Sequence, residues 1–547
     1  MRMLSSRWPL KSREHASLEE IGRLPLHVKD VSRVGLSEKL KQIRTLEAKA
    51  RSSCKWSTAF DLILKFIAGL PSNPKLPGRT AQLCELSQSD LEILLDKGLL
   101  EVAPDDGTPR LFDLRLFSVT EKWSAVENGN TRRRFIAHTP GSNAAAREFL
   151  DDLQERFDFQ LPSLFECVTD AATSEFAQCD LAWCYGGFLL EPHLRFWCLR
   201  IPDGRIVRLT TIPTGASWCP LLAHIFTDCM ACFCAKRSTR VHTYIDNVKF
   251  LSDHREDVVN AAKFFFALAQ LFRVDINESL CDTLAQRCIG TFLGVVFNHA
   301  DHHANFSEKL VRKLTVIAQQ TYDDFRGMTM RQLVSSWGVL THASQISGST
   351  RGKYYYFLKF LRRRAHERWA LDAPGNFWPS LGDLPATWAQ DELRSQRRDF
   401  KCLTDEAARR SQHITVFSDA TLQGYGITVF FPDGTQSVVA GRWTVHDGPP
   451  CEHINEREAR AVLRALDVVQ SEFRRRRSLG DSAVGISLFV DNTSVIFCLG
   501  KTSSRSFFLN NIICRIRDHP QWASVVRVEY VRSQENPADW LSRLRTV

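Results

Sequence analysis

The chain has 547 residues, more than one hydrophobic core usually holds, so about two to four domains are expected. Its composition, 44% hydrophobic and 24% charged, is typical of a globular protein. No apolar run approaches the ~18 residues of a membrane-spanning helix, so membrane partners are not expected. The net charge of +9 permits a polyanionic partner without requiring one.

The 16 cysteines are scattered, often within apolar stretches, which favours reduced thiols in a protein of the cytoplasm or nucleus. Only Cys229, Cys232 and Cys234 form a tight cluster, and no ligand follows at the spacing of a zinc knuckle, so we expect no metal there. The opening MRMLSSRWPLKSR is basic like a transit peptide, although a basic arm explains it equally well; no secretory apolar core follows.

Periodicity predicts the elements of the first half of the chain. Residues 1–85 are weakly patterned, with a charged helix over Leu36–Lys49. The stretch SQSDLEILLDKGLLEVAP predicts an amphipathic helix ending at Gly98 and then a short strand. Short strands and helices alternate from Leu111 to Thr243, which indicates a mixed α/β domain.

The second half begins with a helical and basic stretch over 305–370. Residues 371–388, rich in Pro and Gly, are typical of a linker. Residues 413–547 predict a mixed sheet with a long helix after the third strand, its five strands being HITVFSDA, YGITVFF, QSVVAGRW, ISLFVDN and VVRVEYV.

Acidic residues recur at the strand ends of this last block. Asp419 ends its first strand, Asp491 ends a later one, and Asp539 opens the final helix. Glu458 lies on the apolar stripe of the long helix, where a carboxylate costs several kcal/mol unless it is paired or bound to metal. Glu456 lies on the polar side and is the weaker candidate.

Four such acids are what two Mg²⁺ ions ~3.5–4 Å apart require. Each alone has a simpler explanation, since Asp419 could belong to a turn and Asp539 could cap a helix. Together, the segments FSDATLQGYG, HINEREARAVLRAL, FVDNTSV and ENPADWLSR resemble the acid-bearing motifs of retroelement ribonuclease H, in the same order. The resemblance implies catalytic metal binding by Asp419, Glu458, Asp491 and Asp539.

A second group of acids lies upstream. Asp180 ends an alternating strand, with Phe176 and Gln178 on the same face. RVHTYIDNVKFLS predicts a hairpin of Val241–Ile245 and Val248–Leu251 with Asp246-Asn247 at the turn. Alone, it could be an ordinary surface hairpin.

The order of TRRRFIAHTPGSN, the Asp180 strand, IPTGASWCPLLAH, YIDN and TFLGVVF resembles a reverse transcriptase. The resemblance implies catalytic metal ligands at Asp180 and Asp246, with two Mg²⁺ (or Mn²⁺) per active site. It also implies a triphosphate contact at Arg134, a sugar contact at Tyr185 and a primer grip. The substrate-binding residues would be Arg134, Tyr185, Gly215, Asn247, Phe292, Leu293 and Gly294.

Three positions depart from the family pattern. Asn247 replaces the second acid of the turn, Thr214 replaces a glutamine, and Leu280 stands near the place of a lysine that protonates pyrophosphate. Because an asparagine still offers a carbonyl oxygen, we expect an impaired polymerase rather than a lost one.

The segments over 308–370 resemble the thumb and connecting segments of DIRS-type and VIPER-type elements. In GKYYYFLKFLRRRAHERW, aromatic and basic residues interleave, which favours contact with a nucleic-acid backbone. An amphipathic helix with its aromatics in the core explains much of the same pattern.

The resemblance implies a multidomain α/β protein, with reverse transcriptase fingers, palm and thumb followed by a ribonuclease H-like α/β domain. The expected boundaries are 1–85 (unknown role), 86–304 (fingers and palm), 305–400 (thumb, connection and linker) and 411–547 (ribonuclease H-like). Expected partners are an RNA template, a DNA primer, their hybrid and dNTPs, in a retrotransposon related to gypsy-type polymerases.

Two alternatives stay open: a degenerate copy with ribonuclease H activity alone, and a non-enzymatic module that binds nucleic acid. No aspartic-protease motif and no integrase segment is apparent, so we expect one reading frame of an element, or a fragment of one.

Overall fold

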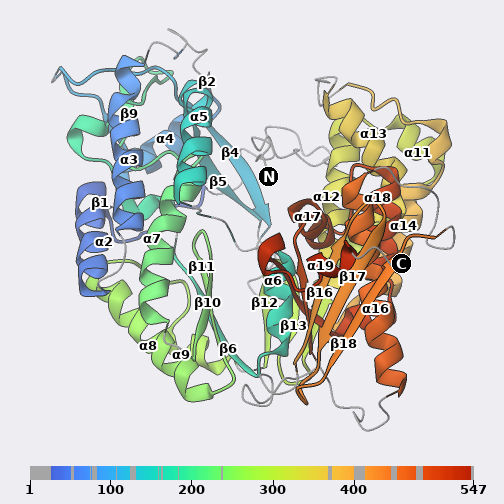
Figure 1. Cartoon of the computed structure of the whole chain (residues 1–547). Coiled ribbons are helices and arrows are strands. Elements are labelled where there is room, and N and C mark those ends of the chain that lie inside the picture. Colours follow the sequence, from blue (N-terminus) through green and yellow to red (C-terminus); the bar gives the residue numbers. More distant parts are fainter. Residues whose placement is uncertain are drawn as a thin grey trace. The chain divides into compact units, whose positions relative to one another are not determined.

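The structure is a computed structural model that describes thirteen stretches of the chain and three isolated residues. The stretches are 26–50, 54–73, 83–105, 107–122, 131–157, 164–182, 184–235, 238–286, 288–366, 373–399, 413–444, 453–475 and 485–543; the isolated residues are 76, 159 and 161. Helices and strands mix throughout, in two compact units, Met1–Gly290 and Thr291–Val547 (Figure 1). None of the described helices is long and apolar enough to span a bilayer.

The first unit holds small sheets surrounded by helices. The sheet that matters most has the order β10-β11-β6, antiparallel throughout, from Arg240–Tyr244, Asn247–Ser252 and Glu175–Asp180. Two others have the orders β2-β4-β5 (Leu83–Cys84, Arg115–Lys122, Thr131–His138) and β3-β9-β8 (Leu100–Val102, Ile206–Leu209, Cys198–Arg200). A short parallel pair joins β1 (Val34–Gly35) and β7 (Phe188–Leu189).

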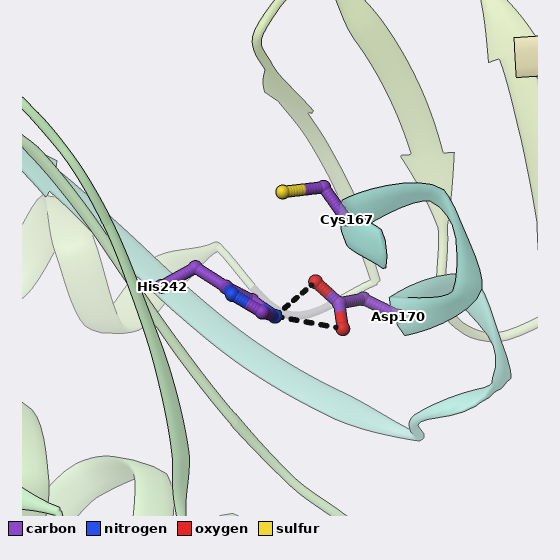
Figure 2. A group of neighbouring side chains, drawn as sticks. All are labelled: Cys167, Asp170 and His242. Carbon is purple, nitrogen blue, oxygen red and sulfur yellow. Dashed lines mark hydrogen bonds and ion pairs between the residues drawn. The ribbon is translucent and has the colours of Figure 1, made fainter. Parts of the chain in front are cut away.

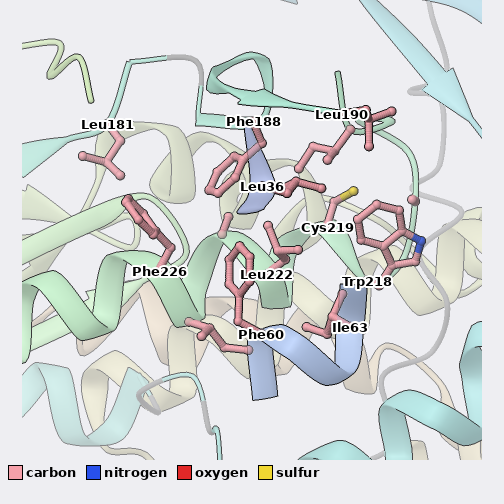
Figure 3. Packing of buried hydrophobic residues seen from close by; sticks show 14 of the residues in the cluster. Leu36, Phe60, Ile63, Leu181, Phe188, Leu190, Trp218, Cys219, Leu222 and Phe226 are labelled. Atoms are coloured by element: carbon pink, nitrogen blue, oxygen red, sulfur yellow. The ribbon is translucent and has the colours of Figure 1, made fainter. Parts of the chain in front are cut away.

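The first unit has eight described α-helices, and all but Leu164–Thr169 contribute side chains to one hydrophobic core or pack against it. They are α2 (Leu36–Ala50), α3 (Lys55–Gly69), α4 (Gln88–Asp96), α5 (Pro140–Phe157), α6 (Leu164–Thr169), α7 (Cys219–Cys234), α8 (Arg255–Leu271) and α9 (Leu280–Ala285). Figure 3 shows Leu36 of α2 and Phe60 of α3 in the same cluster as Leu222 and Phe226 of α7. The predicted helix over Leu36–Lys49 is therefore confirmed and belongs to this core.

The helix and strand predicted over 87–104 are also confirmed, as α4 and β3. Ser87 caps α4: its side chain accepts from the Asp90 N–H, and the Asp90 carboxylate accepts in return from the Ser87 N–H. Gly98, which follows the helix, has a φ of +61°, a conformation that glycine adopts without steric cost.

The second unit opens with a sheet of order β12-β13-β14-β15, of which β12 (Ile289–Phe292) starts at the end of the first unit. The other strands are Val295–Asn298, His303–Phe306 and Arg397–Asp399, and the helices between β14 and β15 are α10 (Glu308–Ala318), α11 (Tyr322–Gly327), α12 (Met330–Ser347), α13 (Tyr355–His366) and α14 (Leu384–Arg394). The predicted helical stretch over 305–370 is confirmed from Glu308 to His366, which is mainly helical, whereas residues 305–306 belong to β14.

The linker predicted over 371–388 is wrong in its described part, which begins at residue 373. Leu384–Arg394 forms α14, with Pro385 in its first turn, where a proline costs no helical hydrogen bond. Trp388 is fully buried and stacks on Tyr354. Pro and Gly here mark a helix start and turns within a folded segment.

The last sheet has the order β18-β17-β16-β19-β20, with antiparallel pairing among the first three strands and parallel pairing to the last two. Its strands are Gln436–Arg442, Gly424–Phe430, His413–Ala420, Gly485–Val490 and Val525–Tyr530, in that order, so all five predicted strands are present. The long helix α16 (Ile454–Arg475) follows the third strand, as predicted, and α17 (Thr493–Lys501), α18 (Phe507–Arg517) and α19 (Asp539–Ser542) complete this part.

Gly426 lets α19 approach this sheet. It pairs with Asp419 across β16 and β17, and a Cβ at this position would lie 2.2 Å from the Ala538 carbonyl oxygen and 2.6 Å from the Leu541 Cβ. Since these are backbone and buried neighbours, a side chain at position 426 would displace the helix that begins with Asp539.

We expect Gly426→Ala to lower the thermal stability of the chain by the cost of overpacking, about 1–3 kcal/mol. Gly500→Ala is the matched control, because Gly500 lies in α17 with nothing within 4 Å of an added Cβ. That substitution should be neutral or stabilise by about 0.5–1 kcal/mol. Equal unfolding free energies for the two variants would contradict the packing described here.

Candidate functional sites

The first site lies where β6 meets the β10–β11 hairpin. Asn247 pairs with Tyr244 on one side and with Asp180 on the other, so these residues stand side by side across the sheet. The turn is Ile245-Asp246, one residue earlier than predicted, because Asn247 already belongs to the strand ladder. Phe176, Gln178 and Asp180 alternate along β6 and share a face, as expected.

The turn is strained. Ile245 has a φ of +60°, a conformation that β-branched residues rarely adopt. Such strain costs of the order of 1–3 kcal/mol and persists only where surrounding contacts hold the backbone. The hairpin therefore presents the Asp246 carboxylate in a fixed place beside Asp180.

Carboxylates repel one another in this site. Burial, then the charges of Asp246 and Glu278, raises the pKa of Asp180 to about 7, against a hydrogen bond from Asn277. Burial also raises the pKa of Asp246, while the hydrogen bond from Asn247 and the positive charge of Arg134 oppose the shift. Arg134 of β5 is thus electrostatically linked to Asp246.

The residues present fit a bound cation. The Asp180 Oδ1 atom is buried and has no hydrogen-bond partner among the described residues, although its Oδ2 accepts from Asn277 at 2.9 Å. A buried carboxylate oxygen without a donor is costly, and a divalent ion satisfies it. Asp180 and Asp246 could hold such an ion.

Asn277 and Glu278 were missed by the sequence analysis. The Glu278 Oε2 accepts from the Asp180 N–H at 2.9 Å, and the Asn277 N–H donates to the Asp180 carbonyl oxygen at 2.8 Å. The available signal was the alternation of polar and apolar residues in VDINES, where Ile276 bridges to Leu181. Because a single bridge has no periodicity, the pattern alone does not reveal it.

Four further residues singled out from the sequence also lie in the first unit. Tyr185, in a short 3₁₀ turn (Cys184–Gly187), is half-buried and packs against the core. Gly215 and Thr214 hold β5: the Gly215 N–H donates to Ala137 O at 2.8 Å, and Thr214 Oγ1 accepts from Ala137 N at 3.0 Å. Leu280 opens α9.

The predicted primer grip forms the β12–β13 turn, with left-handed φ at Leu293 (+52°) and Gly294 (+77°). Phe292 is buried, and an added Cβ at Gly294 would lie 3.4 Å from His342 Nε2. These residues belong to the second unit.

The second site gathers acids from three elements of the β16–β20 sheet. Asp419 of β16, Asp491 after β19 and Asp539 of α19 each place a carboxylate oxygen within 4.8 Å of the other two. β16 and β19 are parallel neighbours, so their carboxyl ends meet at one edge. Asp419 lies within a strand and not in a turn, and Ala538, not Asp539, is the cap of α19.

Glu458 completes this site from the buried face of α16. Burial, then the charges of Asp491 and Asp419, raises its pKa to about 9, and burial with the neighbouring Asp491 raises that of Asp419 to about 7. The Glu458 Oε2 and Asp491 Oδ1 atoms are buried without hydrogen-bond partners among the described residues. Buried, mutually repelling carboxylates with unsatisfied oxygens suit hard divalent ions.

Polar neighbours orient the other oxygens. Ser533 Oγ donates to Asp491 Oδ2 at 2.9 Å, and Arg543 donates to Asp539 Oδ1 at 2.7 Å. Glu456, the weaker candidate, instead accepts from Ser506 Oγ at 3.2 Å, outside the acid cluster.

Two other motifs have structural explanations. In α7, Cys229 and Cys234 are buried and Cys232 is exposed, and the Cys234 Sγ donates to the Met230 carbonyl oxygen at 3.2 Å. In the aromatic stretch, Tyr354, Tyr355 and Phe357 are buried and only Tyr356 is exposed. These buried aromatic rings pack in the protein core and do not stack on nucleic-acid bases.

Comparisons with known proteins give structural likenesses only. No family model and no curated protein matches the chain. The foamy viral protease-reverse transcriptase dRH with double-stranded DNA is 12% identical, at a TM-score of 0.44, over 94% of this chain and 85% of that one. Two further structures are also 12% identical, with TM-scores of 0.42. Foamy viral protease-reverse transcriptase with double-stranded DNA matches over 92% of this chain and 98% of that one. Foamy viral protease-reverse transcriptase with an RNA/DNA hybrid matches over 95% of this chain and 66% of that one. TM-scores below 0.5 do not establish a common fold or activity.

The acid cluster makes stability depend on pH. Because the folded-state pKa of Glu458, about 9, lies above its ordinary value of 4.5, the folded chain keeps a proton that the unfolded chain releases. Without divalent ions, stability should therefore fall as the pH rises from about 4.5 to about 9. Glu458→Gln should flatten this dependence, measured by thermal denaturation in a chelator. Parallel pH profiles for parent and variant would contradict the assignment.

Proposed function

We propose that the chain is an RNA-directed DNA polymerase with ribonuclease H activity, each reaction using a pair of Mg²⁺ ions, with Mn²⁺ as a possible substitute. The observation that carries the proposal is the presence of two separate carboxylate sites at strand ends, one in each unit, each with buried oxygens that lack donors. Such ions, when bound, offset the charge that builds on a phosphoryl transition state.

At the first site, Asp180 and Asp246 would hold the ions. The Arg134 guanidinium, already close enough to Asp246 to affect its pKa, would bind the triphosphate of an incoming dNTP in a bidentate manner. Tyr185 and Gly215 would contact the nucleotide, with Tyr185 beside the 2′ position of its sugar. In the second unit, Phe292, Leu293 and Gly294 would grip the DNA primer, the role that the resemblance assigns to them.

At the second site, Asp419, Glu458, Asp491 and Asp539 would hold the ions beside the scissile phosphate of the RNA strand. Ser533 and Arg543 would keep Asp491 and Asp539 in place through the hydrogen bonds they already make. Glu458 and Asp419 must lose the protons that burial and the neighbouring carboxylates favour, so ion binding and proton release are coupled.

A second candidate function is a chain with ribonuclease H activity and no polymerase activity. The Asn247 side chain favours it, because its amide donates to Asp246 Oδ1 at 3.1 Å and so occupies an oxygen that an ion would use. The second site has no comparable substitution.

Separate knockouts distinguish the two reactions. Asp180→Asn should reduce primer extension on an RNA template at least about 100-fold, because it removes a carboxylate that acts at the transition state. The same variant should cleave the RNA of a hybrid at the parent rate.

Asp419→Asn is the reciprocal control and should lose cleavage while keeping extension. A parent chain that cleaves hybrids but extends no primer would favour the second candidate function. A parent chain that does neither would overturn the proposal.

Restoring the missing acid should strengthen the first site. We expect Asn247→Asp to lower the Mg²⁺ concentration that gives half-maximal primer extension, because a carboxylate replaces an amide that donates to Asp246. Hybrid cleavage serves as the internal control. A higher Mg²⁺ requirement for extension would show that Asn247 does not face the ions.

A further inference from the structure

A second polar cluster lies on the same face of the β10-β11-β6 sheet as Asp180. His242, Lys249 and Gln178 pair across the three strands, two residues along from Tyr244, Asn247 and Asp180. Since side chains two residues apart share a face, this row lies directly beside the row of the first site. No role in metal or substrate binding was assigned to it above.

The Asp170 carboxylate contacts the basic residues of this cluster. Asp170 lies in the 3₁₀ turn Asp170–Ala172 that follows α6 and leads toward β6, and its side chain is about 1% exposed. The His242 Nε2 lies 3.1 Å from both of its oxygens, as the two dashed lines in Figure 2 show. The Lys249 Nζ and an Arg240 guanidinium nitrogen lie 4.0 Å and 3.8 Å from the same carboxylate.

These contacts reach both strands of the hairpin. Arg240 and His242 belong to β10, and Lys249 belongs to β11. β10 is an edge strand, hydrogen bonded in the sheet to β11 alone, so Asp170 adds a second anchor for it. Arg240 also donates to Thr173, a few residues before β6 begins.

Cys167 lies beside Asp170 and His242, and the three offer ligand atoms within 4.8 Å of one another (Figure 2). A transition metal could use such a set. However, the fully buried Lys249 and the nearby Arg240 already bring positive charge to Asp170, and a dication would be repelled by both. The geometry therefore favours an internal ion-pair network over a metal centre.

We propose that Asp170 is a positioning residue for the first site: by holding Arg240, His242 and Lys249, it fixes the hairpin whose strained turn presents Asp246 to Asp180. This inference rests on the proposed polymerase function. The strain at Ile245 gives the reason, because a left-handed isoleucine keeps its conformation only while both strands of the hairpin are held.

The test uses Asp170→Asn, Lys249→Met and the double variant in the full chain. Asp170→Asn alone leaves the buried Lys249 ammonium without its carboxylate, so the melting temperature of this variant should fall. The double variant removes both charges, and its melting temperature should recover, because a buried ion pair exchanged for uncharged groups is often neutral for stability.

The proposal predicts that the double variant, although stable, extends primers with a kcat about 100-fold lower, as a displacement near 1 Å can cause. Its Mg²⁺ requirement for extension should rise, and its hybrid cleavage should stay at the parent rate. Recovery of extension together with stability would overturn the proposal and leave Asp170 with a purely structural role.

Glu101→Gln is the matched control, because it breaks the ion pair with Arg208 (2.6 Å) in another sheet of the same unit. It should lower the melting temperature without changing the Mg²⁺ dependence of extension. An equal change in Mg²⁺ dependence in this control would overturn the proposal, since general destabilisation would then explain it.

Two further readouts separate this proposal from the proposed function. If the parent extends no primer, the affinity of the Asp180–Asp246 site for Mn²⁺ is measured instead, with Asp180→Asn as the reference. Weaker Mn²⁺ binding in the double variant supports the positioning role of Asp170, and unchanged binding overturns it. A parent that binds no Mn²⁺ there overturns both proposals. Stoichiometric zinc in the purified chain that is lost in Cys167→Ser would overturn the ion-pair network alone.

Discussion

Carboxylates that face one another in a partly desolvated pocket repel, and both candidate sites are arranged around that repulsion. In the first unit, Asp246 and Glu278 add to burial in raising the pKa of Asp180 to about 7. In the second, Asp491 and Asp419 act in the same way on Glu458, whose pKa rises to about 9. Buried carboxylates that repel one another are costly, and the cations proposed for the two sites would offset that cost. Phosphoryl transfer is the chemistry that most directly uses such ions.

Much of the surrounding structure serves to bring these acids together. Gly426 gives α19 the close approach that places Asp539 beside Asp419. A left-handed Ile245 forces Asp246 out of the strand ladder, and Asp170 reaches both strands of that hairpin. Each of these features costs stability or needs a specific residue, which is the usual relation between a functional site and the fold that supports it.

The sequence predicts the second site better than the first, for a physical reason. Strands that alternate and one long amphipathic helix fix the faces of Asp419 and Glu458, so their convergence follows from periodicity. In the first unit, the contacts of Asn277 and Glu278 with Asp180 depend on one isolated bridge, which leaves no repeat in the sequence. The linker predicted over 371–388 overlaps the first residues of α14, because Pro and Gly mark helix starts as well as loops. Similarly, Tyr354 and Phe357 pack on Trp388 of α14 and Tyr355 packs on Phe507 of α18, and contacts so distant in the sequence leave no local pattern.

Crystals soaked in Mn²⁺ and measured for anomalous scattering would test the central claim most directly. The account predicts anomalous peaks within ligand distance, about 2.0–2.3 Å, of the carboxylates of Asp180 and Asp246, and separately of Asp419, Glu458, Asp491 and Asp539. Both clusters free of peaks at saturating Mn²⁺, with their carboxyl groups sharing protons instead, would contradict it.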